Sequence, residues 1–149
     1  MRLTLYTDFS LRVLIHLALY EDRLCSIGEI ANAYSISHNH LMKVVNGLVS
    51  GGFIETVRGR SGGLRLARAA KMISVGAVVR HTEEGLHQMA DCPGCALSPA
   101  CGLTGVLAQG VEAMLRVFDS YTVEDLLTDK IVMRRLTERK PPLGFDLVD

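Results

Sequence analysis

Signals for three helices and then for a two-stranded hairpin follow one another in the first 68 residues, and this order restricts the possible folds most strongly. The first helix is predicted from Thr7, which can cap it, to about Tyr20, with Asp8 in the first turn, where a carboxylate suits the helix dipole. Apolar residues dominate from Leu11 to Leu19, so we expect this helix to be buried on more than one side.

Two further helix signals come next. Ser26, with a glutamate three residues later, is a capping-box pattern that predicts a short helix over residues 27–33. Ser37 can cap a third helix that runs to about Ser50, where two glycines end it. The third helix has one apolar face, formed by Leu41, Val44, Val45, Leu48 and Val49. Its other face is polar and is therefore available for a partner.

A glycine-rich hairpin is predicted after the third helix. Residues 53–58 and 64–67 have the composition of two short strands, and the sequence Gly-Arg-Ser-Gly-Gly at 59–63 joins them. Glycine permits the positive φ angles that a hairpin turn requires. The turn also carries an arginine, so we expect its tip to be flexible, basic and exposed.

This order of elements is that of a winged helix-turn-helix, in which the second helix of the pair enters the major groove and the hairpin, or wing, touches phosphate or the minor groove. Side chains at the exposed start of that recognition helix and along the wing would then contact DNA. The predicted DNA-binding residues are Ser26, Ser37, His38, Asn39, His40, Lys43, Arg58, Arg60, Ser61 and Arg65. A helix-hairpin unit that binds protein is the alternative.

Basic residues are concentrated where this interface is predicted. The chain has 16 Lys/Arg and 16 Asp/Glu, so its formal net charge is zero. Between Lys43 and Arg68, however, the basic residues are opposed by a single acid, Glu55. Any affinity for phosphates must therefore be local to that stretch.

Neither a secretory signal nor a membrane span is expected. The N-terminal segment lacks a basic start followed by an apolar run and a small-residue cleavage site. The longest apolar stretch, Val13 to Tyr20, is far shorter than the roughly 20 residues that cross a bilayer. We therefore expect a cytoplasmic protein with no membrane partner.

Three of the four cysteines, Cys92, Cys95 and Cys101, fall within ten residues with the spacing C-x2-C-x5-C. In a reducing cytosol such a cluster indicates a metal site or a redox centre rather than a disulfide framework. The spacing differs from the C-x2-C-x2-C run of bacterial ferredoxins and provides no second C-x2-C pair for a zinc ribbon. The fourth cysteine, Cys25, is interpreted as a small buried apolar residue.

Three thiolates leave a metal centre one ligand short, and more than one chemistry fits the incomplete set. Zinc would need His81, His87 or another group to complete a tetrahedron. A redox pair at Cys92 and Cys95 would exploit the ability of a C-x-x-C loop to lower a thiol pKa. No cofactor loop, nucleophile–base pair or carboxylate dyad occurs in the sequence, so we do not expect an enzyme.

The C-terminal half is predicted to be mostly helical. Ser74 can cap a helix over residues 75–84, residues 103–120 form a long amphipathic helix, and residues 124–129 form a last short one. A long helix after a compact domain typically packs against its twin in a homodimer. The predicted fold is therefore mainly α with a small β-hairpin: a winged helix-turn-helix domain plus a long dimerisation helix.

These elements divide the chain into three parts. Residues 1–72 are predicted to be the winged helix-turn-helix DNA-binding region. Residues 73–138 would contain a cluster-binding loop, which holds the three cysteines, and the dimerisation helices. Residues 139–149, which include two adjacent prolines, are expected to form a flexible tail.

Several stretches resemble the IscR/NsrR family of bacterial winged-helix regulators, and together they span nearly all of the chain. They are residues 1–18, 37–48, 52–67, 99–103 and 119–127. The run VRGRSGGLRLA from Val57 to Ala67, together with the cysteine loop, is specific for the family. Asp8 and the segment SYTVEDLL at Ser120–Leu127 point to the NsrR type, which comprises nitric-oxide-sensing iron–sulfur repressors.

That resemblance implies a transcriptional repressor that binds a double-stranded DNA operator as a homodimer, with nitric oxide as its signal. It also implies an iron–sulfur cluster, [4Fe-4S] rather than [2Fe-2S]. The cluster would take thiolate ligands from Cys92, Cys95 and Cys101 and an oxygen ligand from Asp8 of the partner subunit. The alternatives are a related family regulator that senses iron–sulfur or redox status, and a zinc or dithiol redox or interaction module.

Overall fold

The computed structural model describes residues 3–86, 95–97 and 100–139. Its elements, in chain order, are α1 (Leu5–Leu19), α2 (Ile27–Tyr34), α3 (His38–Ser50), β1 (Ile54–Val57), β2 (Gly63–Leu66), η1 (Ala70–Met72), α4 (Val75–Thr82), α5 (Leu103–Asp119), η2 (Glu124–Leu126) and α6 (Lys130–Glu138). The chain is mainly helical with one two-stranded antiparallel hairpin, which confirms the predicted fold class. Within the described residues, none of the helices combines the length and apolarity that crossing a bilayer demands.

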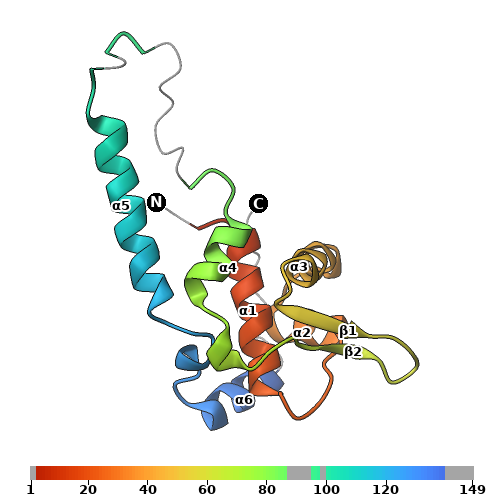
Figure 1. The fold of residues 1–149 in the computed structure, drawn as a ribbon. Coiled ribbons are helices and arrows are strands. Elements are labelled where there is room, and N and C mark those ends of the chain that lie inside the picture. The colour runs from red at the N-terminus through yellow and green to blue at the C-terminus, as the bar shows by residue number, and fades with distance from the viewer. Residues whose placement is uncertain (1–2, 87–94, 98–99, 140–149) are drawn as a thin grey trace.

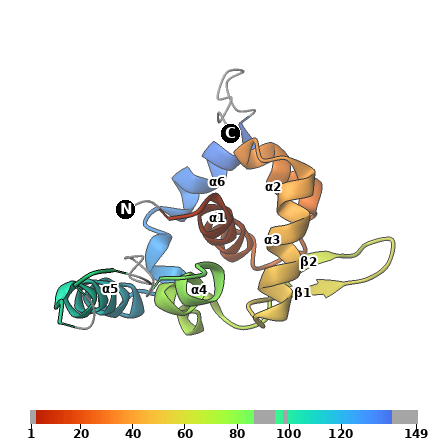
Figure 2. The same cartoon turned by 90° about the horizontal axis from the view of Figure 1, so that it is seen from above.

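Helix α1 lies at the centre of the molecule, with α2, α3, α4 and α6 around it (Figure 2). The prediction that Thr7 caps this helix is wrong: the cap is Thr4, whose hydroxyl accepts a hydrogen bond from the Thr7 N–H at 3.3 Å. Thr7 is instead fully buried and donates its hydroxyl to Thr82 in α4 at 2.8 Å. Burial on more than one side is confirmed, because α1 is covered by helices in several directions.

The helix-turn-helix pair is capped as predicted. The Ser26 hydroxyl accepts from the Glu29 N–H at 3.1 Å to begin α2, and the Ser37 hydroxyl accepts from the His40 N–H at 3.3 Å to begin α3. Between the two helices, Ser35 ends α2 with a φ of 54°, a left-handed conformation that turns the chain sharply. The two caps and this turn therefore fix where the recognition helix starts.

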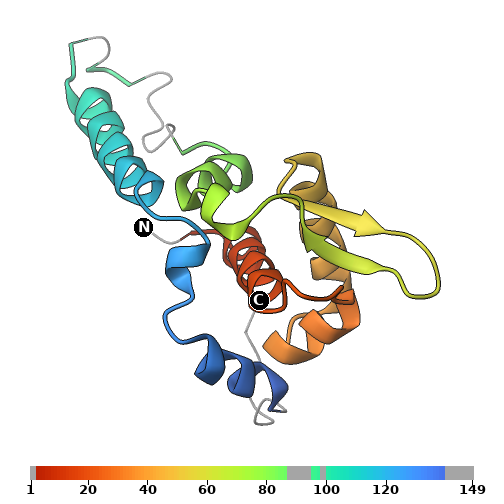
Figure 3. The ribbon, with the colours of Figure 1, turned by 60° about the horizontal axis from the view of Figure 1, so that its bottom comes forward.

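Strands β1 and β2 form the wing, which projects from the molecule beside α3 while α5 projects on the opposite side (Figures 1 and 3). The antiparallel register pairs Ile54 with Leu66 and Val57 with Gly63. Gly59, with a φ of 116°, provides the positive φ angle at the turn. Strand β1 is shorter than the predicted 53–58, whereas β2 has the predicted length and starts one residue earlier than expected.

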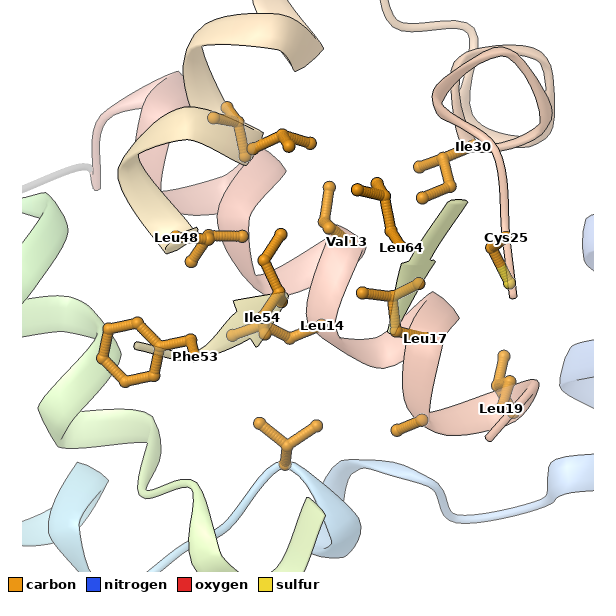
Figure 4. Packing of buried hydrophobic residues seen from close by; sticks show 14 of the residues in the cluster. Val13, Leu14, Leu17, Leu19, Cys25, Ile30, Leu48, Phe53, Ile54 and Leu64 are labelled. Carbon is orange, nitrogen blue, oxygen red and sulfur yellow. The ribbon is translucent and has the colours of Figure 1, made fainter. Parts of the chain in front are cut away.

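A single large apolar core lies under the helix-turn-helix pair and the base of the wing (Figure 4). Val13, Leu14 and Leu17 from α1 are at most 2% exposed and pack with Leu48 of α3 and Ile54 of β1. Burying a side chain of this size contributes roughly 1.5–3 kcal/mol. The core therefore fixes α3 and the wing against α1.

The C-terminal part starts with a second, smaller core. Val75 and Val79 of α4 pack against Val111 and Leu115 of α5. The predicted long helix at 103–120 is confirmed as α5, but its N-terminal half extends beyond this contact (Figure 1). Three apolar side chains of α5 are exposed: Leu103 and Val106 in that half, and Val117 nearer the C-terminal end.

The end of the chain differs from its prediction. A helix was expected at residues 124–129, whereas the structure has only the 3-10 turn η2 there, followed by α6, which was not predicted. The Asp129 side chain caps α6 by accepting from the Val132 N–H at 3.0 Å. Arg134 then donates through Nε to the Leu19 carbonyl at 2.8 Å, which brings α6 back to the end of α1.

Candidate DNA interface and metal centre

The exposed start of α3 carries most of the predicted base-reading side chains. Ser37, His38, Asn39, His40 and Lys43 are all exposed on this helix or its cap. Leu41 and Val44, in contrast, are at most 1% exposed and anchor the opposite face in the core. Because the apolar face of α3 is buried in the core, the polar residues of its other face are exposed together.

The wing adds arginines beside α3. Arg58, Arg60 and Ser61 are exposed at or near its tip. Arg65 is also exposed, but it forms a cross-strand ion pair with Glu55, its partner in the β-ladder. Sequence reasoning noted Glu55 as the one opposing acid but missed this pairing, which the strand register alone could have indicated.

Ser26 lies apart from the start of α3, at the beginning of α2. Its side chain is exposed, and its hydroxyl is used to cap α2. The first turn of α2 thus offers backbone N–H groups and a small hydroxyl, which is the combination that meets phosphate at helix N-termini.

Two of the three clustered cysteines fall in the described part of the chain. Cys95 and Cys101 are free thiols and both are exposed. Cys92 lies outside the described residues. The described pieces of the loop, residues 95–97 and 100–102, lie at the N-terminal end of α5, away from α1 in every view (Figures 1–3). Accessible thiols on irregular backbone suit a site whose metal or cluster is inserted after folding.

Asp8 lies on the surface of α1. Its Oδ2 accepts from Arg12 Nε at 3.0 Å, one turn further along the helix, and its side chain is 41% exposed. The pair borders a hollow of about 370 Å³ whose other walls are Leu3, Leu5 and Leu11.

The turn of α1 that carries Asp8 also contacts the recognition helix. The Phe9 ring lies 6.2 Å from that of His40, centroid to centroid. Tyr6 packs against Gly47, where a Cβ atom would lie only 1.7 Å from the tyrosine oxygen. Side chains from the first turns of α1 therefore lie against α3.

His81, considered as a possible zinc ligand, also contacts Gly47. Its Nε2 is 2.8 Å from the Gly47 carbonyl, and its ring packs edge-on against Phe53 at 5.4 Å. This nitrogen is already engaged in holding α4 to the end of α3. The second histidine considered for zinc, His87, lies outside the described residues.

A polar cluster that sequence reasoning missed joins α1 to the start of α2. His16 of α1 lies with its Nε2 3.3 Å from Glu29 Oε1, and Arg23 forms an ion pair with the same carboxylate. Burial lowers the pKa of His16, the Arg23 hydrogen bond lowers the pKa of Glu29, and burial raises the pKa of Cys25 to about 11. One sequence signal for this cluster is that a histidine, His16, interrupts the apolar run of the predicted first helix.

The fold and its basic, exposed helix-and-wing face define a class, the winged-helix transcriptional regulators. The chain belongs to the Rrf2 family, described as "Iron-dependent Transcriptional regulator", whose pattern matches residues 3–129. Its relatives are regulators and not enzymes, as the sequence predicted.

Relatives named "HTH-type transcriptional regulator NsrR" are similar over nearly their whole length. The one from Halalkalibacterium halodurans is 46% identical over 147 residues, which cover 95% of this chain and 100% of the relative. The one from Bacillus subtilis is 45% identical over 146 residues, covering 94% and 99%. The predicted resemblance to NsrR-type members of the family is therefore confirmed.

Solved structures share the fold. CymR, titled the global cysteine regulator of B. subtilis, superposes with a TM-score of 0.73 at 24% identity and covers 87% of this chain and 99% of its own. IscR of T. potens gives a TM-score of 0.71 at 24% identity, covering 87% and 88%. These likenesses support the winged-helix architecture of the chain.

Proposed function

We propose that this regulator is a dimeric repressor whose operator affinity is controlled by an iron–sulfur cluster that reacts with nitric oxide. The observation that carries the proposal is the pair of free, exposed thiols of Cys95 and Cys101 in a chain 46% identical to an NsrR protein over 95% of its length. Cytoplasmic location and the absence of a membrane partner belong to the same proposal.

The proposed donor set is Cys92, Cys95 and Cys101 with Asp8 of the partner subunit, and [4Fe-4S] is favoured over [2Fe-2S]. Thiolates suit iron–sulfur iron, and a hard carboxylate is the more exchangeable fourth ligand. When bound, the cluster supplies an iron whose weakly held ligand nitric oxide can replace. Asp8 suits this role because its carboxylate is 41% exposed and, within the described part of the chain, is paired with Arg12 of its own helix.

A homodimer is the assembly that this donor set requires, and we place its contact on α5. Leu103, Val106 and Val117 of α5 are 52%, 66% and 56% exposed in a single chain, and a symmetric contact with a second α5 would cover them. In this arrangement residues 73–138 hold the cluster and the dimer contact, and residues 1–72 bind DNA. Of the proposed flexible tail at 139–149, residues 140–149 lie outside the described residues.

The chain itself supplies the connection between Asp8 and DNA. If Asp8 is released from a partner's cluster, the first turns of α1 lose one anchor. Phe9 then carries the change to His40, and Tyr6 carries it to Gly47, because both pairs are in direct contact. The two recognition helices of the dimer shift relative to successive major grooves, and the operator is released.

DNA recognition is proposed to follow the placement of the side chains. The exposed start of α3 enters the major groove, where Asn39 and His40 meet base edges. The wing's Arg58 and Arg60 meet phosphates, while Arg65 must exchange its Glu55 partner for one. The remaining proposed contacts are Ser26, Ser37, His38, Lys43 and Ser61.

Anaerobic purification followed by iron and sulfide quantification tests the cofactor. The wild-type protein should be brown with broad visible absorbance, and Cys92→Ser, Cys95→Ser or Cys101→Ser should each lose most of the iron. The matched control, Cys25→Ser, should keep its iron, because Cys25 is buried and lies far from the loop in the sequence. Colourless protein whose bound zinc is lost in Cys95→Ser, or a Cys92–Cys95 disulfide without iron, would instead support the zinc or dithiol alternatives.

Subunit mixing tests the ligand from the partner. An Asp8→Ala protomer and a Cys101→Ser protomer, each defective alone, should together form a dimer with one complete site. Its iron should resist a chelator as wild-type iron does, at up to half the wild-type content. Mixed dimers that lose iron as fast as Asp8→Ala homodimers would exclude Asp8 of the partner subunit as a ligand.

A further inference from the structure

Outside the cysteine loop, one group of described side chains combines three donors that metal ions use. His16 comes from α1, Cys25 from the loop after it and Glu29 from α2, and one ligand atom of each lies within 4.8 Å of the others. His16 is 1% exposed and Cys25 is 0% exposed. Cys25 lies at the edge of the core, near Ile30 (Figure 4). Glu29 is 32% exposed, so the group has a buried floor and an open side.

We propose that His16, Cys25 and Glu29 bind Zn²⁺ or a similar borderline-soft divalent cation, with water as the fourth ligand. Imidazole, thiolate and carboxylate are the three side-chain donors that Zn²⁺ takes in proteins. This site is distinct from the proposed cluster site, because it shares no residue with the cysteine loop or with Asp8.

The spacing of the donors fits a tetrahedral ion. Two ligands that each lie about 2.05 Å from one ion at the tetrahedral angle are about 3.3 Å apart. His16 Nε2 and Glu29 Oε1 are 3.3 Å apart. The separations from the Cys25 sulfur are at most 4.8 Å, so they need to close by no more than about 1.3 Å to reach thiolate distances, which rotation of the Cys25 and Glu29 side chains can supply.

A positive charge already occupies the open side of the group. Arg23 Nη1 donates to Glu29 Oε2 at 3.0 Å and lies 3.6 Å from the Cys25 sulfur. A bound cation would take this place, and Arg23 would move outward, where its guanidinium carbon already lies 4.3 Å from the Tyr20 ring centroid. The Cys25 thiol would release its proton to solvent as the sulfur coordinates the ion.

His16 lacks strong partners in the absence of an ion. Its Nδ1 is buried with no hydrogen-bond partner among the described residues, and its Nε2 has only the 3.3 Å contact with Glu29. Polar atoms this deeply buried are normally satisfied. Coordination through Nε2 would replace the long contact with Glu29 by a strong one, while Nδ1 keeps its position without a partner among the described residues.

The position of the site connects it to the wing. The Cys25 N–H donates to the Leu64 carbonyl at 3.1 Å, and the Leu64 N–H donates to the Cys25 carbonyl at 2.8 Å. A cation held by Cys25 would thus join α1, α2 and the base of β2 at one point. We expect the Tm to rise by about 5–10 °C when free zinc exceeds its Kd 100-fold.

Cobalt titration of a full-length variant tests the proposal. With Cys92, Cys95 and Cys101 replaced by serine, Cys25 is the one thiol left in the sequence. Reduced, metal-free protein should bind one Co²⁺ per protomer and develop tetrahedral visible bands with a near-ultraviolet thiolate-to-cobalt charge-transfer band. Excess Zn²⁺ should abolish both signals. Because only Cys25 can produce the charge-transfer band, folded protein without that band would overturn the proposal.

Variants in the same background separate the site from adventitious thiol binding. Cys25→Ser should remove the charge-transfer band, and Glu29→Gln should weaken cobalt affinity at least about tenfold while circular dichroism stays native. Glu55→Gln, which removes the acid of the Arg65 ion pair, is the matched control and should change neither signal. An unchanged cobalt affinity in Glu29→Gln would also overturn the proposal.

Discussion

The contact between α1 and α3 predicts an unusual response to a Gly→Ala substitution at Gly47. An alanine in the interior of a helix normally stabilises it by about 1 kcal/mol relative to glycine. At Gly47, however, the new Cβ atom would lie 1.7 Å from the Tyr6 oxygen, far inside van der Waals contact. Tyr6 must therefore swing out of its place between α1 and α3.

The two opposing effects set the expected magnitude. Inserting a group into a packed site typically costs about 1–3 kcal/mol, so Gly47→Ala should lower the free energy of unfolding by about 1 kcal/mol after the helix gain. Tyr6→Phe removes the clashing oxygen and leaves the ring carbon Cζ, which would lie 3.1 Å from the new Cβ, as the nearest atom. The double variant Gly47→Ala/Tyr6→Phe should recover at least the stability that Gly47→Ala alone loses. The coupling free energy between the two sites should be about 1–2 kcal/mol.

Urea unfolding of the metal-free protein, followed by circular dichroism, measures these free energies. The matched control is Gly28→Ala in α2, where the nearest atom to a new Cβ is the Ser26 hydroxyl oxygen at 4.0 Å, so stability should not fall. If Gly47→Ala is as well tolerated as Gly28→Ala, or if Tyr6→Phe does not rescue it, the assigned contact between α1 and α3 is incorrect.

Other predictions concern DNA contacts, capping and pH. Arg60→Ala should weaken binding to specific and random DNA alike and reduce the salt slope by about 1, whereas Asn39→Ala should change which sequence is preferred; equal losses on both DNAs for Asn39→Ala would refute its role. Ser37→Ala removes the cap of α3 and should lower the free energy of unfolding by about 1 kcal/mol, measured by urea unfolding. The hydrogen bonds from Arg80 lower the pKa of Asp119, so their stabilisation is present above the ordinary aspartate pKa of about 4 and is lost below it. The difference in unfolding free energy between wild type and Arg80→Gln should therefore shrink as the pH falls below about 4, and a difference independent of pH would contradict this pairing.

Local signals predicted the DNA-facing half of the molecule well. The caps at Ser26, Ser37 and Ser74 were each read correctly, because a serine hydroxyl within reach of an N–H three residues on needs no tertiary information. The amphipathic pattern of α3 likewise predicted which face is buried, since its apolar residues follow helical spacing.

The errors arise where distant segments decide the outcome. Thr7 was assigned as a cap from its position, but its hydroxyl is held by Thr82, which is 75 residues away. Helix α6 was missed because it is short and rich in charged residues, and because it is held partly by Arg134 at the end of α1. The His16 cluster was missed because Cys25 and Glu29 join it only through tertiary packing.

Operator affinity before and after exposure to nitric oxide tests the central claim most directly. Anaerobically purified protein with measured iron and sulfide should bind its operator, and nitric oxide should weaken that binding by about tenfold or more. Full operator affinity after nitric oxide has reacted with the iron of the same protein would contradict the account.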